Sequence, residues 1–141
     1  MSYGEKAFEE FKVGDATTFS KTITEADILL FTAVSGDNYP LHVDAEYAKT
    51  TRFGARAAHG MLTASLLSTV IGLMLQKPGG IYVEQSLRFR RPVFIGDTLT
   101  ATAEVTELLP AERRLRIRTT IVNQHGKAVV EGDALIQKDP R

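Results

Sequence analysis

The second half of the chain alternates between apolar and polar side chains over four stretches, 81–89, 99–105, 115–121 and 130–136. Successive side chains of a β-strand point to opposite faces, so each stretch predicts a strand with one apolar face. Polar segments rich in turn-forming residues separate the stretches, which favours antiparallel pairing of neighbours. These segments are Gly96-Asp97, Pro110-Ala111-Glu112 and Gln124-His125-Gly126-Lys127.

The first half of the chain has a helical pattern instead. Residues 61–75 are almost continuously apolar, and we predict one long helix from about Gly60 to Gln76, stopped by Pro78-Gly79-Gly80. The run is shorter than the roughly 20 residues of a membrane-spanning helix and contains serine and threonine, so a buried helix is favoured. No membrane partner is expected.

A strand over 17–23 and a shorter helix from Glu25 to about Ser35 precede it. Thr24 has the position of a helix N-cap, with Asp27 three residues later as in a capping box, and Gly36 suits the helix end. A loop over 37–42, a helical turn over 45–50 and an irregular segment over 53–58 are expected next.

An antiparallel sheet with one apolar face must cover something, and the most apolar element here is the 61–75 helix. The pattern therefore predicts an α+β fold in which the sheet wraps around a long central helix, of the hot-dog type. A length of 141 residues suits a single domain over 1–141.

Composition narrows the functional classes. The formal net charge is zero, so no overall basic field points to nucleic acid or to an anionic membrane. The chain has no cysteine, which excludes disulfides, thiolate metal sites and a cysteine nucleophile. The polar N-terminus lacks a signal core, and together these features fit a cytoplasmic protein.

The segment Ser35-Gly36-Asp37-Asn38-Tyr39-Pro40-Leu41-His42 contains the strongest candidate chemistry. Asp37 and His42 are five residues apart in a short segment stiffened by Pro40, so both side chains can turn toward one point. Gly60 opens the long helix, whose first N–H groups have no intrahelical partners. An acid/base pair beside such donors is what addition of water to an activated double bond requires. The alternative is a loop-capping Asp37 and a surface His42.

Arginines form a second candidate group. Arg88 and Arg90 share one strand face and precede Arg91-Pro92, so they could bind the phosphates of a nucleotide-bearing substrate; a solvated strand face is the alternative. We interpret His59 as a structural donor or packing residue. No phosphate-binding glycine loop, dinucleotide fingerprint or metal-ligand spacing is found, so neither a cofactor nor a metal is expected.

Over about 11–136 the chain resembles the MaoC-type (R)-specific enoyl-CoA hydratases, the small single-domain kind that feeds polyhydroxyalkanoate synthesis. The resemblance is carried by the segment 35–44, then by Ala58-His59-Gly60-Met61-Leu62, and more generally by 85–89 and 92–97. It implies a hot-dog fold, a coenzyme A thioester substrate, no cofactor, and a homodimer or larger assembly with sheets joined edge to edge.

The resemblance also implies roles for single residues. Asp37 and His42 match the family's catalytic pair and Gly60 its oxyanion-hole glycine, while Ser68 and Ile71 match positions that line the acyl pocket. Tyr39 stands directly before the proline, where the family usually has asparagine; Asn38 is one place earlier.

Three other functions remain open from the sequence. A 3-hydroxyacyl-carrier-protein dehydratase would use the same pair on another carrier. An acyl-CoA thioesterase of the same fold would direct water to the thioester carbon. A non-catalytic subunit could bind an acyl thioester without turning it over.

Overall fold

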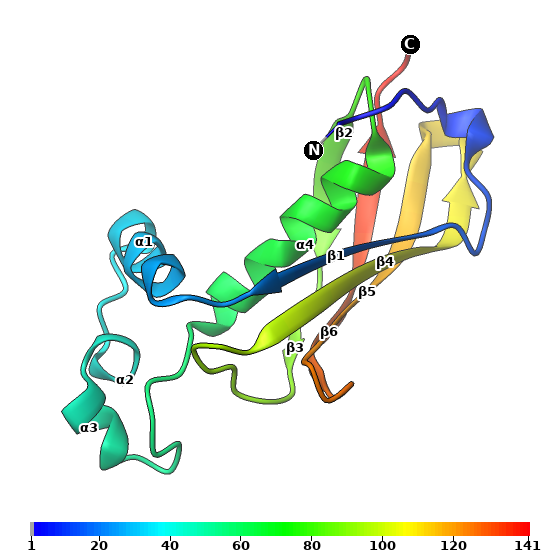
Figure 1. Cartoon of the computed structure of the whole chain (residues 1–141). Helices are drawn as coiled ribbons and strands as arrows, with labels where there is room; N and C mark the ends of the chain where they lie inside the picture. Colours follow the sequence, from blue (N-terminus) through cyan, green and yellow to red (C-terminus); the bar gives the residue numbers. More distant parts are fainter. Residues whose placement is uncertain (1) are drawn as a thin grey trace.

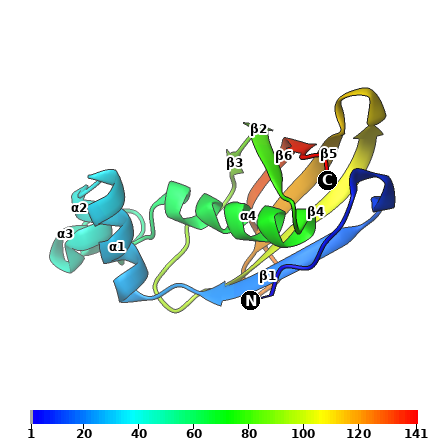
Figure 2. The ribbon, with the colours of Figure 1, turned by 90° about the horizontal axis from the view of Figure 1, so that it is seen from above.

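The computed structural model describes residues 2–141 as a six-stranded antiparallel sheet around one long helix (Figures 1 and 2). The central helix is α4 (Gly60–Leu75). Strands run in the order β1-β4-β5-β6-β2, and β3 also pairs with β6. The strand bounds are β1 Ala16–Thr22, β2 Gly80–Gln85, β3 Arg88–Phe89, β4 Thr98–Leu109, β5 Arg114–Val122 and β6 Ala128–Lys138.

The inner face of the sheet and α4 together form the core. The alternating apolar positions 99, 101, 103 and 105 of β4 are all fully buried, as are Leu115, Ile117 and Ile121 of β5. From α4, Leu67, Val70 and Ile71 enter the same cluster. The predicted fold class is confirmed, because the period-two pattern does bury one sheet face against the most apolar helix. None of the helices in residues 2–141 has the length and hydropathy needed to cross a bilayer.

Strand register places one row of inner-face side chains beside the start of α4. Phe19 of β1 is opposite Ala101, Ala101 is opposite Ile121, and Ile121 is opposite Val130 of β6. Val130 is in turn opposite Phe89 of β3. Directly opposed residues share a face of the sheet. The row therefore ends with Phe89 next to the N-terminal turn of α4.

The prediction of one continuous strand over 81–89 is wrong. The chain leaves the ladder at Ser86 and Leu87, between β2 and β3, and the β2–β6 register also shifts between Tyr82 and Glu84. Ser86 still holds β6, because its amide donates to the Asp133 carbonyl at 2.9 Å and its hydroxyl accepts from the Asp133 amide at 2.9 Å. Along β2, Ile81 and Val83 stay exposed.

A small helical lobe extends beyond one end of the sheet (Figure 1). It contains α1 (Glu25–Ser35), α2 (Pro40–Val43) and α3 (Ala45–Lys49). The expected loop over 37–42 thus ends earlier than predicted. Pro40 takes the first helical position of α2, where its fixed φ suits a helix and its missing N–H is not needed.

The α1 N-terminus has the predicted capping box. Asp27 N donates to Thr24 Oγ1 at 3.2 Å, and Thr24 N donates to Asp27 Oδ2 at 2.9 Å. Gly36 ends α1 in the left-handed conformation, with φ of 79°. These two ends fix where the chain enters and leaves α1, and Asp37 follows directly.

The stability that Asp27 contributes through the capping box depends on pH. Partial burial raises the pKa of Asp27, but bonds from the Thr24 amide and the Lys21 ammonium outweigh it, so this pKa lies below its ordinary 3.8. A lowered pKa contributes stability above the unfolded value that is lost as pH falls through the folded one. We expect Asp27→Asn to lower the free energy of unfolding by about 0.5–2 kcal/mol near pH 7. In urea titrations this loss should shrink well below pH 3.8, whereas Asn at the exposed Asp133 should change little.

Candidate functional site

The α1–α2 connection brings Asp37 and His42 together. His42 Nε2 lies 4.0 Å from Asp37 Oδ2. The connection is ordered by its own hydrogen bonds: Asp37 N donates to Ser35 Oγ at 3.1 Å, and Tyr39 N donates to Asp37 Oδ1 at 3.1 Å. The Asp37 side chain is 48% exposed and that of His42 14%, so one group faces water and the other protein.

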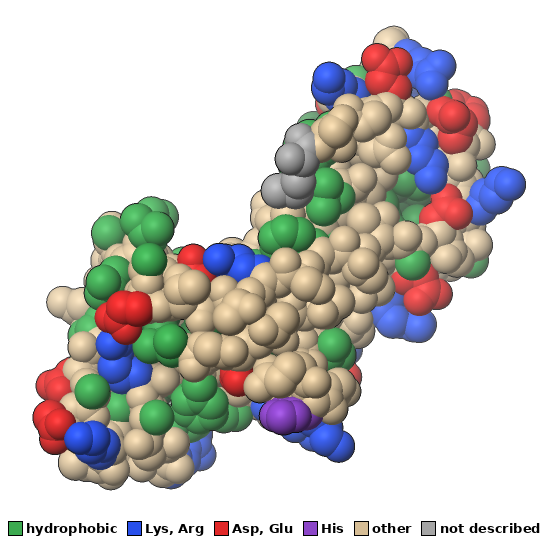
Figure 3. All heavy atoms as spheres, viewed as in Figure 1, with side chains coloured by type: hydrophobic (Ala, Val, Ile, Leu, Met, Phe, Trp, Pro, Cys, Tyr) green, Lys and Arg blue, Asp and Glu red, His purple; other side chains and the backbone are tan. Residues whose placement is uncertain are grey.

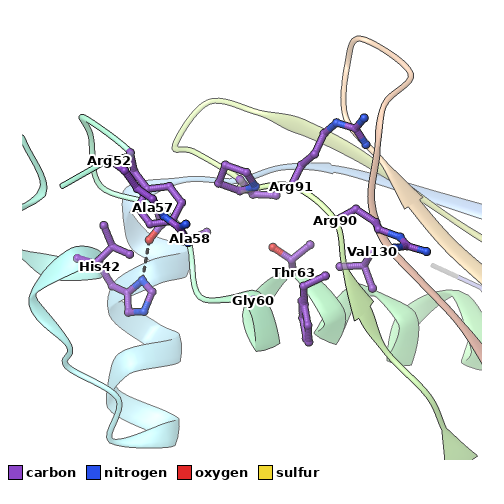
Figure 4. A pocket seen from close by; sticks show the side chains of 14 residues that line it. His42, Arg52, Ala57, Ala58, Gly60, Thr63, Arg90, Arg91 and Val130 are labelled. Carbon is purple, nitrogen blue, oxygen red and sulfur yellow. Dashed lines mark hydrogen bonds between the residues drawn. The ribbon is translucent and has the colours of Figure 1, made fainter.

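His42 is held in one orientation by the segment before α4. Its Nδ1 lies 2.7 Å from the Ala57 carbonyl oxygen (Figure 4). A carbonyl only accepts, so Nδ1 carries the hydrogen and Nε2 is left with a lone pair facing Asp37. This tautomer suits a group that takes a proton.

Arg56 fixes the backbone of the same histidine. Its Nε donates to the His42 carbonyl at 2.7 Å, and its Nη1 donates to Glu25 Oε2 at 2.6 Å. The guanidinium thus ties α2 to the start of α1. Sequence reasoning missed Arg56 because it lies in a segment without periodicity.

The N-terminus of α4 completes the site. His59 precedes the helix, is 2% exposed, and stacks on His42 with ring centroids 3.9 Å apart. Gly60 is the first helical residue, where backbone N–H groups lack intrahelical acceptors. A Cβ at Gly60 would lie 3.0 Å from the Phe89 ring. Glycine therefore allows Phe89 to approach these N–H groups closely.

Two neighbouring clefts meet at this point. The smaller, about 240 Å³, is lined by Asp37, His42, His59, Gly60, Met61 and Phe89. The larger, about 350 Å³, shares His42, Gly60 and Phe89 with it and is otherwise lined by Leu41, Arg52, Phe53, Ala57, Ala58, Thr63, Arg90, Arg91, Pro92, Val93 and Val130 (Figure 4). The small cleft thus contains the carboxylate and the imidazoles, whereas the large cleft is lined by apolar side chains and arginines.

The predicted arginines separate. Arg90 lines the larger cleft and pairs with Glu131 at 2.9 Å, whereas Arg88 lines a different hollow with Arg118 and Asp133. Arg52, directly before the irregular segment 53–58, joins the larger cleft and was not predicted. Strand alternation could not have revealed it.

The two predicted pocket positions on α4 lie away from both clefts. Ser68 is exposed and Ile71 is buried in the core. Neither residue lines the clefts around His42 within the described chain.

Tyr39 occupies the family's asparagine position without entering the small cleft. Its ring meets the edge of His42, with centroids 6.3 Å apart, and its hydroxyl lies 3.3 Å from that of Tyr47. The hydrogen bond between the two hydroxyls raises the pKa of Tyr47. Asp37 and His42 are positioned without an asparagine side chain between them.

The site has few groups for a metal ion. Asp37, His42 and His59 have ligand atoms within 4.8 Å of one another. However, His59 Nε2 already bonds to the Asp37 carbonyl oxygen at 2.9 Å. Because His59 Nε2 is occupied and its Nδ1 is buried, the carboxylate of Asp37 and Nε2 of His42 are the ligand atoms left facing the small cleft, fewer than the three or four usual for zinc. The arrangement suits acid/base chemistry on a water molecule.

A sheet wrapped around one long helix, with an acid/base pair at the helix N-terminus, defines a hot-dog-fold protein with a candidate hydratase-type site. The MaoC-like domain family matches residues 10–129. The chain belongs to this family.

Relatives with close similarity are named as hydratases. The (R)-specific enoyl-CoA hydratase of Rhodospirillum rubrum is 48% identical over 134 residues, 95% of this chain and 92% of the relative. The unliganded R-hydratase PhaJ1 of Pseudomonas aeruginosa superposes with a TM-score of 0.89 at 47% identity, covering 95% of this chain and 86% of that one. The (R)-hydratase of A. caviae, described as involved in PHA biosynthesis, also gives 0.89, at 40% identity over 93% and 99% of the two chains.

Proposed function

We propose that the chain is a hydro-lyase that reversibly adds water to trans-2-enoyl-CoA and forms (R)-3-hydroxyacyl-CoA. The observation that carries the proposal is the Asp37 carboxylate 4.0 Å from His42 Nε2, in a cleft bounded by the N-terminus of α4. The names of the relatives, which specify (R)-specific hydratases, support the same reaction.

In the proposed mechanism a water molecule lies between the two side chains. His42 Nε2 takes one proton from the water as its oxygen bonds to C3 of the enoyl group. The water's other hydrogen, held by the Asp37 carboxylate during attack, stays on the new hydroxyl group. The proton taken by His42 is then relayed through the Asp37 carboxylate to C2, so both side chains end as they began. The opposite division of the two roles would use the same geometry. Because both parts of the water reach one face, addition is syn.

Gly60 supplies the third element of the proposal. As C3 is attacked, negative charge develops on the thioester oxygen. The first backbone N–H groups of α4 and the positive end of the helix dipole would stabilise that charge. A larger residue at position 60 would press on the Phe89 ring, so glycine suits this end of the cleft.

The larger cleft is the proposed path of the coenzyme. Arg52, Arg90 and Arg91 line it and could meet phosphate oxygens, while its apolar wall suits the pantetheine arm. Arg88, in the neighbouring hollow, would act at longer range. We still propose that Ser68 and Ile71 determine the acyl length that the enzyme accepts. For this role the acyl chain must extend along α4 beyond the two described clefts.

We further propose a homodimer or larger homo-oligomer. Strand β2 is an edge of the sheet and exposes Ile81 and Val83, and α1 exposes Leu30 and Val34. Figure 3 shows hydrophobic side chains at the surface of the helical lobe. An exposed apolar edge strand is normally covered by a partner. Light scattering of purified protein would decide the state, and a monomer would contradict the proposal.

Substrate comparison tests the function against its alternatives. Purified protein would be given crotonyl-CoA, the same acyl group on carrier protein, and butyryl-CoA. Rapid hydration of crotonyl-CoA without release of thiol from butyryl-CoA supports the proposal. Preference for the carrier-protein substrate would instead indicate a carrier-protein dehydratase. Release of thiol from butyryl-CoA would indicate a thioesterase. No turnover of any of the three substrates would indicate a binding subunit.

Arg56 should affect turnover through His42. Lysine keeps the charge of Arg56 but cannot bridge two acceptors with a rigid fork. We expect Arg56→Lys to lower kcat about tenfold, which corresponds to about 1.4 kcal/mol. Lysine at Arg116, which pairs with Glu107 on the outer sheet face, is the matched control and should leave kcat unchanged. Equal kcat in both variants would exclude this role of Arg56.

A further inference from the structure

His59 is a buried histidine for which the proposed mechanism has no use. It lies between α1 and α2: Phe31 packs on it with ring centroids 4.8 Å apart, and His42 stacks on it at 3.9 Å with an interplanar angle of 26°. Its Nε2 lies 2.9 Å from the main-chain carbonyl oxygen of Asp37 and 3.4 Å from Thr32 Oγ1. One ring thus contacts both members of the acid/base pair.

These contacts determine the tautomer of His59. The Asp37 carbonyl oxygen can only accept, so Nε2 carries the hydrogen. Nδ1 is buried and has no hydrogen-bond partner within residues 2–141. A second hydrogen there would be a buried donor without an acceptor, which is unfavourable. In the neutral ring the single N–H is therefore on Nε2.

We propose that His59 is a positioning residue, whose Nε2–H fixes the Asp37 backbone while its neutral ring stacks on His42 and supports the positive charge that His42 acquires. The inference rests on the proposed function, since it assigns His42 as the group that takes the water proton. A neutral aromatic face attracts a cation placed over it. Because Nδ1 is buried and has no hydrogen bond to His42 or to any other described group, His59 does not share that proton. The two histidines consequently have opposite tautomers and different tasks.

Substitutions can separate the two contacts. His59→Gln retains an amide donor for the Asp37 carbonyl but removes the ring. His59→Phe retains a ring for His42 but leaves the carbonyl without its donor. His59→Leu removes both. Misplacement of a reacting group by about 1 Å can cost a factor of about 10² in rate, so we expect kcat losses of about 10-fold to 100-fold for Gln and Phe and a larger loss for Leu.

A merely structural residue would not give this pattern. Purified variants would be compared by kcat, KM and thermal melting, with His125→Gln, in the exposed β5–β6 turn, as the matched control. The proposal predicts lower kcat with KM within about threefold of wild type, and Gln and Phe each retaining more activity than Leu. Lower melting temperature with wild-type kcat in all three variants would overturn it, as would a loss confined to KM.

A measurement on the wild-type protein tests the ring arrangement without turnover. Long-range proton–nitrogen NMR correlations at neutral pH should show His59 with its hydrogen on Nε2 and His42 with its hydrogen on Nδ1. A hydrogen on Nδ1 of His59 would overturn the proposal. If these tautomers are found but no enoyl thioester is hydrated, the proposed function is wrong, and the role of His59 in supporting His42 is wrong with it. The NMR and kinetic results together therefore distinguish failure of the function from failure of the ring arrangement.

Discussion

Asp37→Asn and His42→Gln are each expected to lower kcat by a factor of about 10²–10⁴, the usual contribution of a positioned acid or base. Both substitutions nearly preserve side-chain volume. Asn at position 37 can still accept the Tyr39 amide, and the rest of the loop does not depend on the charge. The expected loss is therefore chemical, and melting temperatures should stay close to that of wild type.

The double variant distinguishes a cooperating pair from two independent residues. Groups that act on one water molecule behave as a unit, so removing the second should cost little more than removing the first. His125→Gln is the control for exposed imidazoles. Two mild losses that multiply in the double variant would contradict the shared-water mechanism. Steady-state hydration of crotonyl-CoA is the measurement.

Gly132→Ala is expected to have the largest effect on stability. Gly132 of β6 lies against the backbone between β2 and β3, and a Cβ there would overlap the Ser86 carbonyl oxygen. The obstacle is main chain, so no side-chain rotation can relieve it. Overpacking costs about 1–3 kcal/mol and occasionally more. We expect the high end, together with displacement of β3 and of Phe89 at the site.

Gly72→Ala is the matched control within the same protein. On α4 a Cβ at Gly72 would meet only the Tyr3 ring, at 3.9 Å, which is ordinary contact. Alanine also favours a helix over glycine by about 0.8–1.0 kcal/mol. Urea unfolding should show Gly132→Ala destabilised and Gly72→Ala unchanged or stabilised. Equal stability of the two variants would mean that β6 and Ser86 do not pack as described.

Much of the fold follows from local pattern. The strands at 99–105, 115–121 and 130–136 and the helix from Gly60 were predictable because burial on one face imposes a period on the sequence. The 81–89 stretch shows where this reasoning fails. Its alternation is equally regular, but the side chains of β2 stay exposed and Ser86 leaves the ladder. The conformation of residues 81–89 is therefore set by strand pairing around Gly132 and by the position at the sheet edge, and not by hydrophobicity.

The candidate site was only partly predictable. Asp37 and His42 are close in sequence and share one short connection, so their proximity could be expected. By contrast, the Ala57 carbonyl, Arg56 and Arg52 come from a segment without periodicity and reach the site through long-range contacts. Arg88 and Arg90 look equivalent in the sequence, but β3 ends at Phe89 and the two arginines line different hollows.

The proposed reaction adds water to the C2–C3 double bond of the enoyl thioester from one face. The most direct test is to mix purified protein with crotonyl-CoA, follow loss of the enoyl absorbance, and determine the configuration of the product. We expect the enoyl absorbance to fall rapidly and the product to be (R)-3-hydroxybutyryl-CoA. Formation of the (S) product or of a racemate would contradict attack of water on the single face that gives the (R) product, and unchanged crotonyl-CoA would contradict the proposed reaction itself.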